Sequence, residues 1–320
     1  MAAVNTVVDL GGEQMVRLLD RAERRMNELA AGHGPLLAQY AGQTIAAGGK
    51  RLRPLLVFLA AGTPPPESDE LLRSAVAVEL IHGATLIHDD VLDGSALRRG
   101  RPTVFAAGGR SMAIATGDLL FSRAFSELVG VGSVQAVRVL ARTTRELAAG
   151  EVMQRADAFD VELGEERYLE RCRLKTAVLF RAACELGCLQ GPGPTTELGA
   201  FGEQIGLAFQ ILDDVLDVTG PPERTGKPRG TDLLDGTVTL PLIVARLRDE
   251  EMASLDLGQV QTPADAAALC DRITATGALN DARSRALELV ASAKQALPSL
   301  PRRQRAALEL VADGVVERYT

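Results

Sequence analysis

Tryptophan is absent from this 320-residue sequence, and aromatic residues make up only 3% of it. The core must therefore be filled by alanine, leucine and valine, which suit the packing of helix on helix. An excess of positive charge is also lacking, because 35 lysines and arginines are outnumbered by 42 aspartates and glutamates, which gives a net charge of −7. This balance argues against a nucleic-acid-binding protein. The shares of hydrophobic and charged residues, 46% and 24%, are ordinary for a soluble globular protein.

Cysteines are few and form no CxxC pair, and the four are Cys172, Cys184, Cys188 and Cys270. We expect them in the core rather than in disulfides or a metal site, and free cysteines fit a reducing cytoplasm. No stretch approaches the roughly 20 uninterrupted apolar residues of a membrane span. The N-terminal residues lack a basic region followed by an apolar run, so no signal peptide is predicted. These features together predict a cytoplasmic protein without a transmembrane segment.

Apolar residues recur at intervals of three and four through most of the chain, a pattern typical of amphipathic helices. No convincing alternation typical of strands is present. Breaks rich in glycine and proline fall at 62–66, 99–102, 191–194 and 220–236. We therefore predict an all-α protein that forms a single domain over 1–320, with about ten or more helices.

The pentapeptide Asp-Asp-Val-Leu-Asp occurs twice, at 89–93 and 213–217. On a helix, residues four apart share a face, which pairs Asp89 with Asp93 and Asp213 with Asp217. Carboxylates at this spacing repel each other unless a cation lies between them, and Mg²⁺ prefers such ligands together with phosphates and water. Two such helices facing each other would hold a diphosphate through several Mg²⁺ ions. A single copy could equally be a solvated acidic face; the second copy favours the metal interpretation.

Basic residues lie near both acidic motifs in the sequence. They occur in Gly-Gly-Lys-Arg-Leu-Arg-Pro at 48–54, at Arg98 and Arg99, at Lys175 and at Lys227. Each basic pair alone is more often a surface feature. Because arginine and lysine bind phosphate oxygens, the combination predicts two phosphate sites, one bridged by metal and one held directly by cations.

These segments resemble the head-to-tail trans-prenyl diphosphate synthases, also called polyprenyl synthetases. The matching segments, in the family's order, are GGKRLRP, LIHDDVLDGSALRRGRPT, GDLLF, GEVMQ, KTA, FQILDDVLD, GKPRGTD and TLPL. The resemblance implies one large helical bundle around a central apolar cavity, and assembly as a homodimer is expected with it. It also implies Mg²⁺-dependent condensation of isopentenyl diphosphate with an allylic diphosphate, with about three Mg²⁺ ions per site.

The resemblance also implies a role for each matching residue. Metal ligation is implied for Asp89, Asp93 and Asp213, and metal-bound water or tuning of the metal cage for Asp90, Asp214 and Asp217. Contact with the allylic diphosphate is implied for Arg98, Lys175 and Lys227, and binding of isopentenyl diphosphate for Lys50, Arg53, His82 and Arg99. Thr176 and Gln210 would lie near the developing carbocation. His82 could equally be a helix histidine with a local hydrogen bond, and no role is expected for His33 or His88.

The chemistry fits these groups. Mg²⁺ and cationic side chains would stabilise the charge on the departing diphosphate, and juxtaposition of the two substrates would replace a bimolecular encounter. Because water must be excluded, the segment 220–236 is a candidate lid. One departure is Thr237, where the family usually has lysine.

Product length is predicted from Ala84 and Thr85, which lie about one turn before Asp89 on the same predicted helix. Short-chain members of the family carry bulky aromatic groups near this point. The small residues here predict products longer than C15, with medium or long chains favoured over C20. A deeper floor could be formed by Phe121, Phe125 or Leu147. Small packing residues at a helix crossing would show the same pattern.

Two other functions compete with chain elongation. A class I terpene cyclase uses a similar acidic motif but needs no second diphosphate site, so Lys50, Arg53 and Arg99 argue against it. A non-catalytic subunit of a heteromeric synthase should have lost acidic ligands, whereas both motifs are complete. Only Thr237 points toward that alternative.

Overall fold

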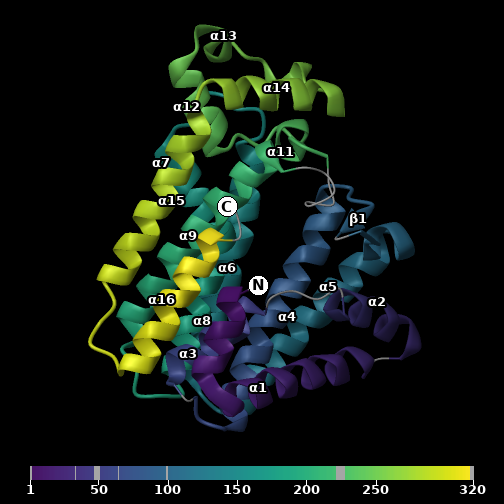
Figure 1. Cartoon of the computed structure of the whole chain (residues 1–320). Helices are drawn as coiled ribbons and strands as arrows, with labels where there is room; N and C mark the ends of the chain where they lie inside the picture. The colour runs from purple at the N-terminus through teal and green to yellow at the C-terminus, as the bar shows by residue number, and fades with distance from the viewer. Residues whose placement is uncertain are drawn as a thin grey trace. The chain divides into compact units, whose positions relative to one another are not determined.

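The computed structural model describes residues 2–32, 34–46, 51–63, 65–98, 100–220 and 228–317. Within these ranges the chain is almost entirely helical (Figure 1). The exception is a minimal antiparallel pair, β1 (Leu97–Arg98) and β2 (Arg101–Pro102). The all-α prediction is confirmed. Three predicted site residues, Lys50, Arg99 and Lys227, lie outside the described residues.

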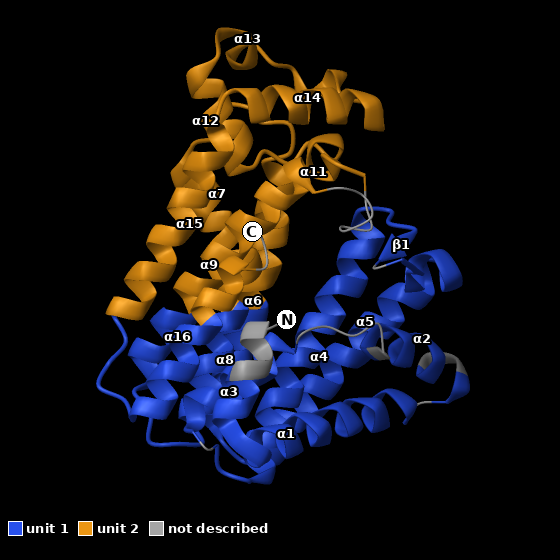
Figure 2. Cartoon of the chain, in the orientation of Figure 1, with its two compact units in different colours: residues 1–144, 179–202, 296–311 blue, residues 145–178, 203–295, 312–320 orange. Residues whose placement is uncertain are grey.

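The chain forms two compact units, each assembled from separate stretches of sequence (Figure 2). Unit 1 comprises residues 1–144, 179–202 and 296–311, and unit 2 comprises 145–178, 203–295 and 312–320. The single domain over 1–320 stays a prediction. The two acidic motifs belong to different units, and each is therefore described within its own unit.

Unit 1 is built mainly from the N-terminal helices. Two of them, α1 and α5, bend at glycines with positive φ, Gly12 and Gly109. The elements of this unit are α1 (Ala2–Ala31), α2 (Pro35–Ala46), α3 (Leu52–Ala61), α4 (Asp69–Leu92), α5 (Val104–Val131) and most of α8 (Val178–Cys188). Parts of α6 (Val134–Ala156), α9 (Thr195–Thr219) and α16 (Arg302–Glu317) also belong to it.

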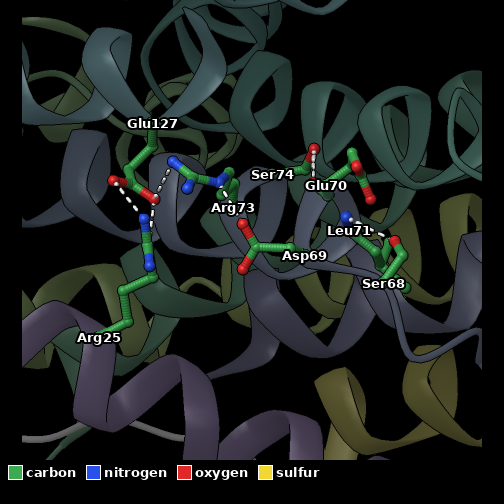
Figure 3. Close-up of polar contacts among 8 residues, drawn as sticks. All are labelled: Arg25, Ser68, Asp69, Glu70, Leu71, Arg73, Ser74 and Glu127. Atoms are coloured by element: carbon green, nitrogen blue, oxygen red, sulfur yellow. Dashed lines mark hydrogen bonds and ion pairs between the residues drawn. The ribbon is translucent and has the colours of Figure 1, made fainter. Parts of the chain in front are cut away.

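The N-terminal end of α4 is fixed by its own sequence. The Ser68 hydroxyl caps the helix by accepting from the Leu71 backbone N–H at 3.0 Å. Arg73 donates to Asp69 at 2.5 Å, and this hydrogen bond lowers the pKa of Asp69. Figure 3 shows Arg73 beside Glu127 of α5, which also pairs with Arg25 of α1 at 2.5 Å. These ion pairs tie three helices of unit 1 together.

The central helix of unit 1 is α4, which packs along α5 and against α3. By length and composition α4 could cross a membrane, a test that the sequence was expected to fail. However, 67% of its apolar window is buried inside the protein. The core helix of a soluble protein passes the same test, so α4 is weak support for a membrane span.

Unit 2 holds the C-terminal helices and the segment that leads into α8. It contains α7 (Glu165–Cys172), a π-helix η1 (Arg173–Ala177), α11 (Thr231–Leu234), α12 (Leu240–Arg248), α13 (Glu250–Ala253), a 3₁₀ turn η2 (Leu257–Gln259), α14 (Pro263–Ala275) and α15 (Ala278–Gln295). The start of α14 is a capping box in which Thr262 and Asp265 satisfy each other's backbone N–H groups. Most of α9 belongs here.

Several sequence predictions about breaks and cysteines are confirmed. The breaks at 62–66 and 191–194 separate α3 from α4 and α8 from α9. All four cysteines are buried and free. The predicted lid, 220–236, is described only at its two ends, because residues 221–227 lie outside the described ranges.

Candidate active site

The first acidic motif lies at the C-terminal end of α4. Asp89 lies in the last turn of the helix, and Asp93 is its C-terminal cap, with its backbone N–H donating to the Asp89 carbonyl at 2.8 Å. Both side chains are half-buried. The C-terminal end of a helix carries partial negative charge, so two carboxylates there are unfavourable without a cation. The local structure therefore favours a cation-binding role for this pair.

Asp90 differs from its neighbours because it is buried. Its Oδ1 accepts a hydrogen bond from Nε of Arg98 at 2.9 Å and forms an ion pair with Nη2 of the same residue at 2.8 Å. Arg98 belongs to β1, which follows the motif and pairs with β2. The motif thus uses its middle aspartate to hold a predicted phosphate-binding arginine.

The basic segment before α3 is anchored by a residue to which the sequence assigned no role. Arg51 adopts a left-handed conformation, with φ of 46°, directly before α3. Its guanidinium bridges Glu23 of α1 and the buried Glu79 of α4, at 2.8 and 2.9 Å. Two residues on, the guanidinium of Arg53 lies 4.6 Å from the centre of the Phe180 ring. The basic segment at 48–54 contains both Arg51 and Arg53, and its sequence alone did not show which arginine pairs with carboxylates of the protein and which is left to bind substrate.

The histidines of α4 have local roles in unit 1. The carbonyl of half-buried His82 accepts from the Thr85 hydroxyl at 2.9 Å. His88 stacks on Phe121 of α5 with ring centres 5.8 Å apart, and its Nε2 lies 3.5 Å from Asp118. Packing against α5 accounts for the position of His88.

The second acidic motif lies in the last turns of α9, in unit 2. Asp213 and Asp217 are half-buried and one helical turn apart, as predicted. The Asp217 side chain accepts from the Asp232 backbone N–H at 3.3 Å, and its carbonyl accepts from Gly230 at 2.9 Å. The described part of the segment that follows α9 is thereby attached to the motif.

Asp214 is the buried member of the second motif. Tyr168 Oη donates to its Oδ2 and Gln210 Nε2 to its Oδ1, both at 2.7 Å. Burial, reinforced by Asp232, raises the pKa of Asp214 to about 8, although both hydrogen bonds act in the opposite direction. The Thr176 hydroxyl in turn donates to Gln210 Oε1 at 2.6 Å. The structure therefore brings together Thr176 and Gln210, the two residues expected near the carbocation.

Lys175 and Thr176 lie on the π-helix η1, an irregularity that often marks functional sites. Lys175 Nζ pairs with Glu151 of α6 at 2.7 Å. Burial acts to raise the pKa of Glu151, but Lys175 and Arg155 together outweigh it, so the pKa lies below its ordinary value. Between the two helices, a Cβ at Gly150 would lie 2.7 Å from the Lys175 backbone nitrogen. This close approach explains the glycine of the GEVMQ segment, to which the sequence assigned no role.

The donor set fits magnesium bound with substrate. Each motif offers two half-buried carboxylates one turn apart. Among the described residues, no group of three or more histidine, cysteine or acidic side chains could hold a metal ion alone. Mg²⁺ commonly takes one or two carboxylates and completes its shell with phosphates and water. The residues therefore suit metal that arrives with a diphosphate.

The residues predicted to set product length lie in unit 1, apart from Leu147. Ala84 is fully buried and Thr85 half-buried on α4, while Phe121 and Phe125 are half-buried on α5. Leu147 belongs to the part of α6 in unit 2. Thr237, also in unit 2, is half-buried, and its backbone N–H donates to the Asp232 carbonyl at 2.7 Å.

Comparison with known proteins decides the family. The polyprenyl synthetase family model matches residues 34–270, which include both acidic motifs. The chain belongs to the polyprenyl synthetase family. The expected resemblance is confirmed, and the enzyme is a prenyltransferase that elongates isoprenyl diphosphates.

Similar proteins are named as synthases of products of several lengths. The chain is 42% identical over 252 residues to heptaprenyl diphosphate synthase component 2 of Geobacillus stearothermophilus, covering 77% of this chain and 78% of that protein. It is 39% identical over 213 residues to the octaprenyl diphosphate synthase of Escherichia coli, covering 66% of each.

Solved structures of the family share the fold across nearly the whole chain. A polyprenyl synthase from Caulobacter crescentus, complexed with calcium and isoprenyl diphosphate, matches with a TM-score of 0.90 and 37% identity over 99% of this chain and 98% of that one. A decaprenyl diphosphate synthase from Rhodobacter capsulatus matches with a TM-score of 0.87 and 34% identity over 99% of each chain. These structures support the helical isoprenoid-synthase fold.

Proposed function

We propose that this enzyme condenses isopentenyl diphosphate head-to-tail with an allylic diphosphate, in a Mg²⁺-dependent reaction, to give a linear trans-polyprenyl diphosphate longer than C15. The observation that carries the proposal is the pair of identical acidic motifs, each in the last turns of a helix and each exposing two carboxylates in part. The names of the relatives support elongation over the cyclase alternative.

Mg²⁺ would supply charge stabilisation to the departing diphosphate. Asp89, Asp93, Asp213 and Asp217 are the residues proposed to hold it. Asp90 and Asp214 are buried and hydrogen-bonded, so they act by positioning rather than as outward ligands. This geometry favours the tuning role among those that the resemblance implied for them.

The chain's own cations complete the phosphate sites. Arg98, held by Asp90, and Lys175, held by Glu151, are proposed to contact the allylic diphosphate together with Lys227. Lys50, Arg53, His82 and Arg99 are proposed to bind isopentenyl diphosphate. Carboxylate partners fix the cations before substrate arrives, which reduces the entropy lost on binding.

Medium or long chains are favoured as products, with geranylgeranyl diphosphate next. Ala84 and Thr85 are small, and the heptaprenyl, octaprenyl and decaprenyl synthases among the relatives support this choice. A geranylgeranyl synthase from Lactobacillus brevis also shares the fold, so the fold itself does not set the length.

We propose a cytoplasmic homodimer as the active form. The name "component 2" of one relative favours a second possibility, in which this chain needs a different partner chain. Both acidic motifs are complete, so in either case we place the chemistry on this chain.

The test is to incubate the purified chain with isopentenyl diphosphate, Mg²⁺ and each short allylic diphosphate, and to measure product lengths. Elongation by the chain alone is expected. Turnover of an allylic diphosphate without isopentenyl diphosphate would favour the cyclase, and activity only after a second chain is added would favour the heteromer. A chain that binds such a partner but contributes no catalytic residue would be the non-catalytic subunit.

A further inference from the structure

Four polar side chains of unit 2 form a continuous chain of hydrogen bonds. Tyr168 donates to Asp214 at 2.7 Å, Gln210 donates to the other oxygen of Asp214 at 2.7 Å, and Thr176 donates to Gln210 at 2.6 Å. Asp214 and Gln210 are four residues apart on α9, and therefore share one face. Tyr168 and Thr176 lie on α7 and η1, which follow each other directly.

Each bond of this network has a defined donor and acceptor. Gln210 turns its NH₂ group toward Asp214 and its carbonyl toward Thr176. The Thr176 hydroxyl donates its hydrogen to that carbonyl, and the lone pairs of the Thr176 oxygen therefore remain available to another group. Electron-rich oxygen is what a developing carbocation requires.

Tyr168 is the most deeply buried residue of this hydrogen-bond network. It is fully buried, and burial raises the pKa of its hydroxyl, which therefore stays protonated and able to donate. The guanidinium of Arg171 lies 5.6 Å from the centre of the Tyr168 ring. The Tyr168 hydroxyl donates to Asp214, which is a defined acceptor.

We propose that Tyr168 is a positioning residue for allylic ionisation, acting through Asp214 to hold the Gln210 amide and the Thr176 hydroxyl in their reactive orientation. This role rests on the proposed function, because only ionisation of an allylic diphosphate creates a carbocation that the oxygens of Thr176 and Gln210 could stabilise. Tyr168 then affects kcat, since the orientation matters when charge develops and not when substrate binds.

Tyr168→Phe tests this by removing one oxygen and keeping the ring. We expect kcat to fall about tenfold, because one hydrogen bond that holds the network is lost. Affinity for an S-thiolo allylic diphosphate, measured by calorimetry with Mg²⁺, should change less than twofold. Tyr40→Phe is the matched control, because the Tyr40 hydroxyl donates at 3.4 Å to a backbone carbonyl of α5 in unit 1. It should leave kcat and binding unchanged.

A double-mutant cycle separates positioning from a general loss of structure. In a Gln210→Leu background, Tyr168→Phe should lower kcat less than twofold, because the group it positions is gone. An equal fold-loss in both backgrounds, or an equal loss of kcat and analogue affinity, overturns the proposal. Should Tyr168→Phe fail to fold, Asp214→Asn carries the same test, with an unchanged Mg²⁺ concentration for half-maximal activity expected. A raised Mg²⁺ requirement would assign Asp214 to the metal and overturn the proposal.

The two proposals can fail separately. A wild-type enzyme that elongates allylic diphosphates, combined with full kcat in Tyr168→Phe, overturns only the role of Tyr168. A wild-type enzyme that does not elongate any allylic diphosphate overturns both.

Discussion

Arg98 donates from Nε to Oδ1 of Asp90 at 2.9 Å, and its Nη2 forms an ion pair with the same oxygen at 2.8 Å. The Asp90 side chain is only 6% exposed, whereas that of Arg98 is 26% exposed. The buried carboxylate therefore holds a guanidinium whose side chain is itself only partly buried. A residue of the acidic motif thus holds a cation of the proposed phosphate site, in addition to any effect on metal.

Asp90→Asn should raise the KM for the allylic diphosphate about tenfold, because Arg98 loses a charge-assisted partner. Asp69→Asn is the matched control: it removes an aspartate–arginine pair from the same helix, at the exposed N-terminal end. Steady-state kinetics of the two variants provide the measurement. An equal effect of both changes would show that the Asp90–Arg98 pair has no particular role in binding.

The outward aspartates should control metal-dependent turnover. Asp89→Ala and Asp213→Ala are each expected to lower kcat by about 10³-fold or more, with circular dichroism unchanged, since a metal ligand that stabilises the leaving group is lost. Chelation by EDTA should abolish activity and added Mg²⁺ should restore it. The control is Asp281→Ala, which removes an exposed aspartate paired with Arg248. Near-normal kinetics in either motif variant would refute the metal assignment.

The replacement at position 237 offers a gain-of-function test. Thr237→Lys should lower the KM for the allylic substrate or raise kcat/KM, because a cation beside phosphate adds a charge-assisted hydrogen bond. Thr237→Met controls for side-chain length without charge. Unchanged kinetics, with the new lysine directed to solvent in a crystal structure, would show that the family's usual lysine has no counterpart role here.

The fold class and the pairing of the half-buried aspartates could be predicted from the sequence, because both depend on a local periodicity of residue types. The pairing of Asp89 with Asp93, and of Asp213 with Asp217, needs only the repeat of an α-helix. The roles of Arg51 and Tyr168 could not be predicted in this way. Their partners, Glu79 and Asp214, are 28 and 46 residues away, and only tertiary packing brings them together. The same holds for Glu151, which pairs with Lys175 from another helix.

The structure also sharpens the prediction of product length. Ala84 is fully buried on α4, so a phenylalanine there must occupy space that is either filled by neighbouring side chains or reserved for the hydrocarbon tail. Overpacking alone costs about 1–3 kcal/mol of folding stability. Two fully buried alanines of the same helix, Ala77 and Ala75, separate the two effects.

Ala77 is seven residues before Ala84, on the same helical face and about 10.5 Å deeper, whereas Ala75 faces the opposite side. If the tail runs down the Ala84 face from the metal-binding end of α4, Ala84→Phe should give the shortest products. Ala77→Phe should give products between that variant and the wild type, and Ala75→Phe should lower the melting temperature without changing product length. Chromatography of the dephosphorylated products and thermal denaturation measure the two effects separately. An unchanged product distribution in active Ala84→Phe enzyme would show that the tail does not pass this residue. In that case other residues, such as Phe121 or Phe125 on α5, would set the floor, and a graded series of substitutions along α5 would then be expected to change product length.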